Sequence, residues 1–484
     1  MRRTKIVCTI GPATRSEEQL ERLMRAGMNV ARLNFSHGTH EEHAKVVASI
    51  RAISSRLHRP IAILQDLQGP KIRIGTLQEH RPVMLVNGST ITLTTRPLEG
   101  TAELVSTTYK QLPEDVKVGD RILLDDGLLE LRVLDHNETD VKCLVVHGGL
   151  LKEHKGINLP EVAVSVPSLS DKDRDDLRFG IEQGVDYVAL SFVRKPEDIR
   201  EAKEYIKQIQ ADLGVKERDC YVPIIAKLEK PEAIERLDEI LQETDAVMVA
   251  RGDLGVEMAP EKVPLIQKRI IAKCNELCLP VITATQMLES MINNPRPTRA
   301  EASDVANAIL DGTDAVMLSA ETASGSYPIE AVEMMVRIAV ETENGYRASI
   351  QSTMQQRLTQ EQAVSHAARA LSEQTSVKAI VVFTRSGSSA HLISKDRPRT
   401  PIIAYTPSEH VYRRLALWWG VWPQNLPMEG TTERVIADVD CHLQEENLIA
   451  RDEHIVIMGG MPVASRARTN FVKLHCVGEG PQER

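Results

Sequence analysis

The sequence is poor in the residues on which several protein classes depend. Aromatic residues make up only 3% of the 484 residues, which disfavours a surface that stacks bases or sugars. The 7 cysteines are odd in number and scattered, so reduced thiols in the cytoplasm are expected rather than a disulfide framework. No apolar run approaches about 18 residues, so no membrane span and no membrane partner are expected.

Other absences bear on the ligand. The net charge of −9 argues against a nucleic-acid partner. Neither a Walker A sequence nor a G-x-G-x-x-G sequence occurs, so ordinary P-loop and Rossmann nucleotide sites are unsupported. Any phosphate-bearing ligand must therefore be held by a local cationic pocket rather than by the overall charge.

The chain does contain a repeated pattern of short apolar runs, nearly every one followed by a helix-patterned segment. Continuous apolar runs of this length are typical of strands buried on both faces, as in a parallel sheet. Eight such βα units are the number that closes a (β/α)8 TIM barrel. The runs are Lys5–Ile10, Asn29–Phe35, Ile61–Leu67, Tyr187–Val193, Pro223–Glu229, Ala246–Asp253, Pro280–Gln286 and Ala315–Glu321.

The pattern is interrupted once and then replaced. Between residues 71 and 166, alternating Thr- and Val-rich pieces with Gly and Asp turns predict a small antiparallel β domain inserted into a βα loop. Past residue 346, alternating helices and apolar strands predict a separate α/β domain. The predicted domains are the barrel at 1–70 and 167–345, the inserted domain at 71–166 and a C-terminal α/β regulatory domain at 346–484.

The chemistry of a TIM barrel lies at the C-terminal ends of its strands. An inventory of those ends suits a metal and a phosphorylated anion. The ends carry Arg32, Asn34, Asp66, Lys227, Glu229, Asp253, Thr285 and Glu321.

Three of these residues form the strongest candidate site. Lys227 and Glu229 are two residues apart on one strand, so their side chains point to the same side, and Asp253 is expected to end the next strand. Two carboxylates suit Mg²⁺ or Mn²⁺, with water and substrate completing the shell. A lysine beside such a metal would stabilise charge on a transferring phosphoryl group. The alternative is an ion pair that only lines the barrel interior.

The second and third strands offer an anion clamp and a candidate monovalent-cation site. Arg32 could hold a carboxylate or phosphate through two parallel hydrogen bonds. Oxygens of Asn34, Ser36 and Asp66 could hold a monovalent cation. Turn or helix-capping chemistry explains Asn34 and Ser36 equally well.

A Ser-rich loop in the C-terminal domain is a candidate phosphate site. It lies between an expected strand and an expected helix, where backbone N–H groups and hydroxyls can cradle an anion. The domain lacks catalytic residues, so a regulatory effector site is the functional interpretation and a helix cap is the alternative. The loop residues are Thr384, Arg385, Ser386, Ser388 and Ser389.

Seven segments in order resemble signatures of the pyruvate kinase family, along essentially the whole chain. The resemblance implies a glycolytic phosphotransferase that converts phosphoenolpyruvate and ADP to pyruvate and ATP with Mg²⁺ or Mn²⁺. It also implies a homotetramer, and a small β-barrel lid domain that closes over the site and excludes water. The segments are TKIVCTIGPAT, GMNVARLNFSHG, DLQGPKIR, IIAKLEKPEAIE, VARGDLGVE, TATQMLESM and DAVMLSAETASGSYP.

The resemblance further implies individual roles. Lys227 is the transition-state cation, Glu229 and Asp253 hold the divalent metal, and Arg32 holds the substrate phosphate. Gly252, Asp253 and Thr285 contact the substrate, with Thr285 near the enolate face that is protonated. The implied nucleotide contacts are Asn34, Phe35, Ser36, His37, Arg73 and Lys172. The implied monovalent-cation ligands are Asn34, Ser36, Asp66 and Leu67.

Two departures from the family pattern lead to expectations of their own. Many members have Glu where this chain has Lys71, and a lysine there is associated with enzymes that do not need K⁺, since an ammonium can supply the same charge. The effector loop lacks the further basic residue near Ser388 that is typical of fructose-bisphosphate-activated members. A monophosphate effector is therefore expected.

Two other functions remain as alternatives. A metal-dependent carbon–carbon lyase on the same barrel could share the two carboxylates and Arg32, but it would not need Lys227 beside the metal. A phosphometabolite sensor with an inactive barrel would use only the C-terminal domain.

Overall fold

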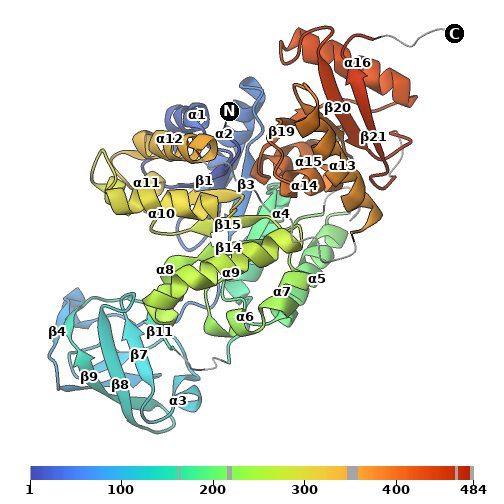
Figure 1. Cartoon of the computed structure of the whole chain (residues 1–484). Helices are drawn as coiled ribbons and strands as arrows, with labels where there is room; N and C mark the ends of the chain where they lie inside the picture. Colours follow the sequence, from blue (N-terminus) through green and yellow to red (C-terminus); the bar gives the residue numbers. More distant parts are fainter. Residues whose placement is uncertain are drawn as a thin grey trace.

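The computed structural model describes residues 2–160, 162, 165–214, 221–345, 358–463 and 467–479, and its central element is a closed barrel of parallel strands. Each of the eight predicted runs contains one barrel strand, so the predicted (β/α)8 barrel is confirmed (Figure 1). Around the barrel the order is β1 (Lys5–Ile10), β2 (Val30–Asn34), β3 (Ala62–Asp66), β12 (Tyr187–Leu190), β13 (Ile224–Leu228), β14 (Ala246–Ala250), β15 (Val281–Ala284) and β16 (Ala315–Leu318).

Helices surround this barrel, and several of them begin at a capping side chain. The side chains of Thr39, Ser170 and Thr298 each accept a hydrogen bond from the third helical residue, whose own carboxylate bonds back to the cap. Such capping boxes satisfy backbone N–H groups at a helix start. The barrel helices are α1 (Glu17–Ala26), α2 (His40–Arg56), α4 (Asp171–Glu182), α5 (Pro196–Asp212), α6 (Pro231–Glu235), α7 (Leu237–Glu243), α8 (Arg251–Glu257), α9 (Val263–Glu276), α10 (Arg299–Leu310), α11 (Ala320–Ala323) and α12 (Pro328–Gly345).

The chain between β3 and α4 forms two sheets around one hydrophobic core, at the lower left of Figure 1. The pairing is antiparallel as predicted, except that β5 and β6 run parallel. One sheet joins β4 (Val83–Leu85) and β10 (Gly149–Leu151). The other contains β5 (Thr90–Thr94), β6 (Leu104–Ser106), β7 (Arg121–Leu124), β8 (Leu129–His136), β9 (Asp140–His147) and β11 (Ile157–Asn158), with the short helix α3 (Leu112–Asp115) nearby.

The C-terminal region is an α/β domain on the side of the barrel opposite the inserted domain (Figure 1). Helices α13 and α14 pack on one face of its sheet and α16 packs on the other. Its sheet has the order β19 (Val421–Asn425), β18 (Ile402–Thr406), β17 (Ile380–Phe383), β20 (His454–Gly459) and β21 (Phe471–Cys476). Its helices are α13 (Gln360–Gln374), α14 (Ser388–Lys395), α15 (Glu409–Arg414) and α16 (Thr432–Glu445).

Strand β19 was not predicted. It contains Pro423 and ends in the polar pair Gln424 and Asn425, a composition that argues against a strand. The sheet order places β19 at an edge, where a proline removes no ladder hydrogen bond from a second neighbour.

The predicted domain limits stay predictions, and the limit at residue 346 lies outside the described residues.

The C-terminal domain also closes the bottom of the barrel. The short helix η4 (Leu415–Leu417) places Ala416 and Leu417 in the same hydrophobic cluster as the residues that fill the barrel interior. Lys5 reaches from β1 to donate a hydrogen bond to the carbonyl of Val421 at 2.7 Å.

In the described ranges, no helix combines the length and apolarity that crossing a membrane requires.

Candidate active site

Lys227, near the C-terminal end of β13, is the centre of the candidate site. Its Nζ donates to Ser191 Oγ at 2.7 Å and lies 2.7 Å from Glu229 Oε1 and 3.3 Å from Asp66 Oδ1. Burial alone would lower the pKa of this amine, but attraction by Asp66, Glu229 and Asp253 outweighs it and raises the pKa. The ammonium is therefore charged at neutral pH, although only 12% of the side chain is exposed.

The two candidate metal ligands come from neighbouring segments. The sequence placed Asp253 at a strand end, but β14 stops at Ala250 and Asp253 lies in the first turn of α8. Burial raises the pKa of Glu229, and the negative charge of Asp253 raises it further, while Lys227 opposes both effects. Repulsion between two carboxylates is what a divalent cation would relieve, so the donor set fits Mg²⁺ or Mn²⁺. The part of the chain that the structure describes has no group of three or more His, Cys, Asp or Glu suited to a metal.

Arg32 lies beside this cluster on β2. Its Nε donates to Asp66 Oδ2 at 2.6 Å and its Nη1 donates to Thr9 Oγ1 at 2.9 Å. Asp66 itself is buried, yet the charges of Arg32 and Lys227 overcome the effect of burial and lower its pKa. Asp66 therefore stays ionised and holds the two cations side by side at the mouth of the barrel.

The loop after β15 carries Thr285 in a conformation that is rare for a β-branched residue, with φ of 68°. Its Oγ1 accepts a hydrogen bond from the backbone N–H of Gly252 at 2.7 Å, which joins it to the turn before Asp253. Arg251 braces the loop, because its Nη2 donates to the Thr285 carbonyl at 2.7 Å and its Nη1 pairs with Asp304. Strain of this kind is maintained only where surrounding contacts fix it.

The segment with the predicted nucleotide residues lies at the same end of the barrel. Lys172 Nζ donates to the carbonyl of Phe35 at 2.8 Å, so α4 and this segment are joined. Burial lowers the pKa of His37, and the nearby charges of Lys71, Arg73 and Arg32 lower it further. The positive charges of three side chains therefore act on His37, which suits an anionic ligand.

The predicted monovalent-cation ligands already have protein partners. Asn34 Oδ1 accepts from the Ser36 N–H at 3.1 Å, and the Leu67 carbonyl accepts from Ser191 Oγ at 2.8 Å. Asp66 is paired with Arg32 and Lys227. Lys71 lies close enough to interact with this cluster, since desolvation and the charge of Lys227 lower its pKa while Asp253 and Glu229 oppose them.

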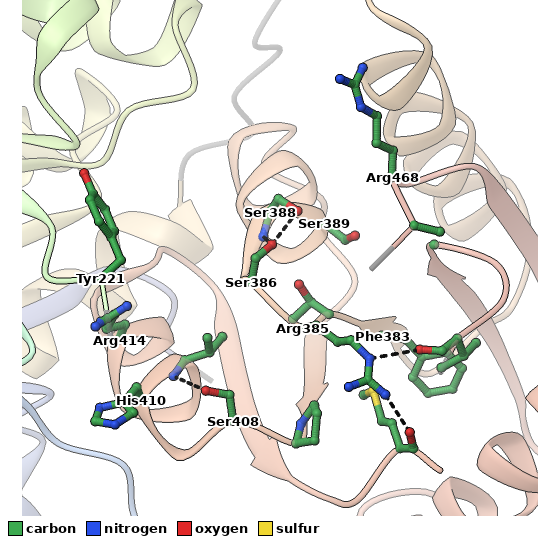
Figure 2. A pocket seen from close by; sticks show the side chains of 17 residues that line it. Tyr221, Phe383, Arg385, Ser386, Ser388, Ser389, Ser408, His410, Arg414 and Arg468 are labelled. Carbon is green, nitrogen blue, oxygen red and sulfur yellow. Dashed lines mark hydrogen bonds between the residues drawn. The ribbon is translucent and has the colours of Figure 1, made fainter. Parts of the chain in front are cut away.

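The predicted effector loop lines a cavity of about 700 Å³ that is formed mainly by the C-terminal domain and is also lined by Tyr221, which precedes barrel strand β13 (Figure 2). Ser386 Oγ and Ser388 Oγ are 3.0 Å apart and exposed, whereas Ser389 is buried and bonds to Thr469 Oγ1 at 2.7 Å. Arg385 is turned away from these serines (Figure 2). Its guanidinium donates to the backbone carbonyls of Met428, at 2.7 Å, and Val463, at 3.3 Å. Thr384 Oγ1 accepts from the Gly387 N–H at 2.9 Å and fixes the turn.

Sequence reasoning missed several residues of the site. Ser191 follows the end of β12 and Thr9 lies near the end of β1, the two barrel strands for which no strand-end residue was proposed, so the same rule could have found both. Arg251 directly follows β14, but its role had no local signal, because its contacts with the Thr285 carbonyl and Asp304 are with segments distant in the chain. Glu321, predicted at the site, is buried and accepts hydrogen bonds from the N–H groups of Leu288 and Ser319.

Comparison with known proteins gives one consistent result. Residues 1–332 match the model of the pyruvate kinase barrel domain and residues 362–475 match that of the pyruvate kinase alpha/beta domain. The chain is 49% identical to a pyruvate kinase of Staphylococcus haemolyticus and 47% identical to one of Staphylococcus aureus, over 99% of this chain and 81% of each relative. The crystal structure of a pyruvate kinase from Cryptosporidium parvum superposes with a TM-score of 0.92 at 38% identity, covering 98% of this chain and 96% of that one.

Proposed function

This chain belongs to the pyruvate kinase family and catalyses phosphoryl transfer from phosphoenolpyruvate to ADP, and we propose that it does so at the Lys227 cluster with a divalent metal. The observation that carries the proposal is the buried, charged Lys227 ammonium, 2.7 Å from a carboxylate and beside a second cation bound to Asp66. Phosphoryl transfer depends on positioning and on stabilising the charge of the transferring group, which these cations supply.

Each residue has a role that follows from its surroundings. Arg32, fixed by Asp66 and Thr9, holds the substrate phosphate at the barrel mouth. Lys227 stabilises negative charge on the phosphoryl group as it leaves phosphoenolpyruvate. Thr285, fixed by Gly252 and Arg251, faces the enolate that remains and helps deliver its proton.

Glu229 and Asp253 would hold Mg²⁺ or Mn²⁺, with Gly252 and Asp253 also contacting the substrate. A bound divalent ion would neutralise phosphate and enolate oxygens during transfer. Glu229 is fixed for this role, because its Oε2 accepts a hydrogen bond from the Phe192 N–H at 2.9 Å.

ADP would lie between the barrel and the inserted β domain. The support is the cationic group of Arg32, Lys71 and Arg73 around His37, with Lys172 bonded to Phe35 and the Asn34–Ser36 turn next to it. Arg73 belongs to the inserted domain, where it bridges to Gly156, so movement of that domain as a lid would bring a cation to the nucleotide. We also propose a cytoplasmic homotetramer, as in the family.

One assay tests the function and its cation requirements together. Purified protein with phosphoenolpyruvate and ADP should form pyruvate and ATP when Mg²⁺ or Mn²⁺ is added, and not when the metal is chelated. A carbon–carbon lyase would release pyruvate from a larger keto acid without ADP. A sensor would bind phosphometabolites and form no pyruvate, so either result would contradict the proposal.

The same assay addresses K⁺, which we expect to be dispensable. The Lys71 ammonium lies near Glu229 and Asp253 and supplies positive charge that another enzyme would take from solution. Near-full turnover is therefore expected when the only monovalent cation is bulky and organic. Lys71→Glu should create K⁺ dependence, and Lys71→Met serves as the control that removes charge without reversing it. Turnover is measured against KCl at constant ionic strength. A wild-type protein inactive without K⁺ would mean that Asn34, Ser36, Asp66 and Leu67 bind the ion.

We propose that the cavity at the start of α14 binds an activating monophosphate. Ser386 and Ser388 present exposed hydroxyls at the helix N-terminus, where backbone N–H groups favour an anion. Thr384, Ser389 and Arg385 shape the loop through their bonds to Gly387, Thr469 and two carbonyls.

The double variant Ser386→Ala/Ser388→Ala should lose activation by a sugar or nucleoside monophosphate and keep its unactivated turnover. The reason is that both hydroxyls belong to the C-terminal domain, in the loop after β17 and at the start of α14, whereas Lys227 belongs to barrel strand β13. Turnover at low phosphoenolpyruvate, with and without each monophosphate, is the measurement. Arg385→Ala with Ser389→Ala is the companion variant, which should abolish activation by distorting the loop. Unchanged activation in both double variants would put the effector elsewhere.

A further inference from the structure

A second buried ion pair joins the two chain segments that carry the candidate metal ligands Glu229 and Asp253. Lys230 immediately follows Glu229, and Glu257 lies one helical turn after Asp253 on α8. Lys230 Nζ is 2.5 Å from Glu257 Oε1, with only 7% and 2% of the two side chains exposed. The pair therefore connects the two segments that carry the metal carboxylates.

Two further contacts hold this pair in place. Asn158, the last residue of β11 in the inserted domain, donates from Nδ2 to the same Glu257 Oε1 at 2.8 Å. Lys230 Nζ lies 5.2 Å from the centroid of the Phe192 ring, and the Phe192 N–H donates to Glu229. Phe192 has a positive φ of 57°, a conformation that needs support from its neighbours.

A buried ion pair is weak evidence for stabilisation, because desolvation of both charges offsets their attraction. A buried ion pair can nevertheless fix geometry, whatever its contribution to stability. The short contact between the two charged groups restricts the separation of the segments to which they belong. Groups that orient metal ligands without touching the metal commonly change metal affinity by about 10–100-fold when they are substituted.

We infer that Lys230 and Glu257 are a positioning pair that sets the separation of the Glu229 and Asp253 carboxylates and thereby the affinity for the divalent metal. This inference rests on the proposed metal site. Neither Lys230 nor Glu257 contacts substrate or metal in this role. Asn158 keeps Glu257 in place from the side of the inserted domain.

The test measures Mn²⁺ binding to the whole chain in the absence of substrates. Electron paramagnetic resonance detects the free and bound Mn²⁺. Lys230→Met and Glu257→Gln are each expected to weaken Mn²⁺ binding about tenfold or more. At saturating Mn²⁺, kcat should return to within about threefold of wild type, since the catalytic cation is untouched. General damage would lower kcat at every Mn²⁺ concentration and would overturn the inference.

A matched control is available in the same chain. Lys395 and Asp314 form an equally short buried pair, with 3% and 0% of their side chains exposed, between α14 and the barrel. Lys395→Met should leave Mn²⁺ affinity unchanged. Equal weakening in Lys395→Met would overturn the inference, because loss of any buried pair would then have the same effect.

Two more variants separate the possible failures. If Glu229→Gln loses Mn²⁺ binding while Lys230→Met and Glu257→Gln bind as wild type does, the positioning role is wrong and the metal site stands. If Glu229→Gln also binds normally, the proposed metal site is wrong and the inference is overturned with it. Should a single variant fail to fold, Lys230→Met/Glu257→Met removes both buried charges and is measured in the same way.

Discussion

Replacing Lys227 by methionine is expected to lower kcat by about 10²–10³ while phosphoenolpyruvate still binds. Methionine keeps the approximate volume of the side chain and removes the charge that we propose meets the transferring phosphoryl group. Arg32, which we propose holds the substrate phosphate, would lose only an indirect neighbour through Asp66. The measurements are kcat at saturating substrate and metal, and equilibrium binding of phosphoenolpyruvate.

Loss of an ion pair could also lower activity through instability, so Lys395→Met is again the matched control. It removes a buried ammonium from a short ion pair outside the active site. Circular dichroism should first show that Lys227→Met and Lys395→Met are both folded. The kcat of Lys395→Met should then be close to that of the wild type. If kcat of Lys227→Met stays within about threefold of wild type, a change below about 1 kcal/mol, the role assigned to Lys227 is wrong.

Glu229→Gln and Asp253→Asn should each raise the Mg²⁺ concentration needed for half-maximal activity by about tenfold or more. A neutral amide keeps the shape of the carboxylate but not its charge, and hard divalent cations prefer ionised oxygen ligands. Titration of Mg²⁺ into each variant at fixed substrate concentrations is the measurement. Wild-type half-saturation in a variant would exclude that residue from the metal shell.

The two variants should differ in their effect on Lys227. Glu229 contributes directly to the charge that surrounds Lys227, at 2.7 Å, whereas Asp253 acts on it from a greater distance and is exposed. Glu229→Gln should therefore also lower kcat at saturating Mg²⁺, while Asp253→Asn should recover more fully.

The sequence by itself was sufficient to predict the barrel and to group the polar residues at its strand ends as a candidate site. Each barrel strand is a run of apolar residues buried on both faces, so local composition alone distinguishes it, as in Lys5–Ile10. The polar residues that interrupt such a run at its C-terminal end, Lys227 among them, are visible for the same reason. Residues two apart on one strand share a side, which correctly grouped Lys227 with Glu229.

Tertiary contacts decided where β14 ends and whether β19 forms. Asp253 belongs to the helix after β14 rather than to the strand, because the chain turns at Arg251, whose guanidinium is held by Asp304 and the Thr285 carbonyl. β19 forms at a sheet edge despite Pro423, since only its contact with β18 is needed.

Contacts between distant segments could come only from the fold. Asp66 pairs with both Arg32 and Lys227, Lys71 approaches the two carboxylates, and Glu257 receives Lys230 and Asn158. A charged residue in a sequence has many potential partners, and the one it meets depends on how the barrel closes and where the inserted domain packs. Local backbone preference and burial fix the strands, whereas the pairing of Arg32 with Asp66 and of Lys230 with Glu257 is fixed by packing between elements more than 25 residues apart in the chain.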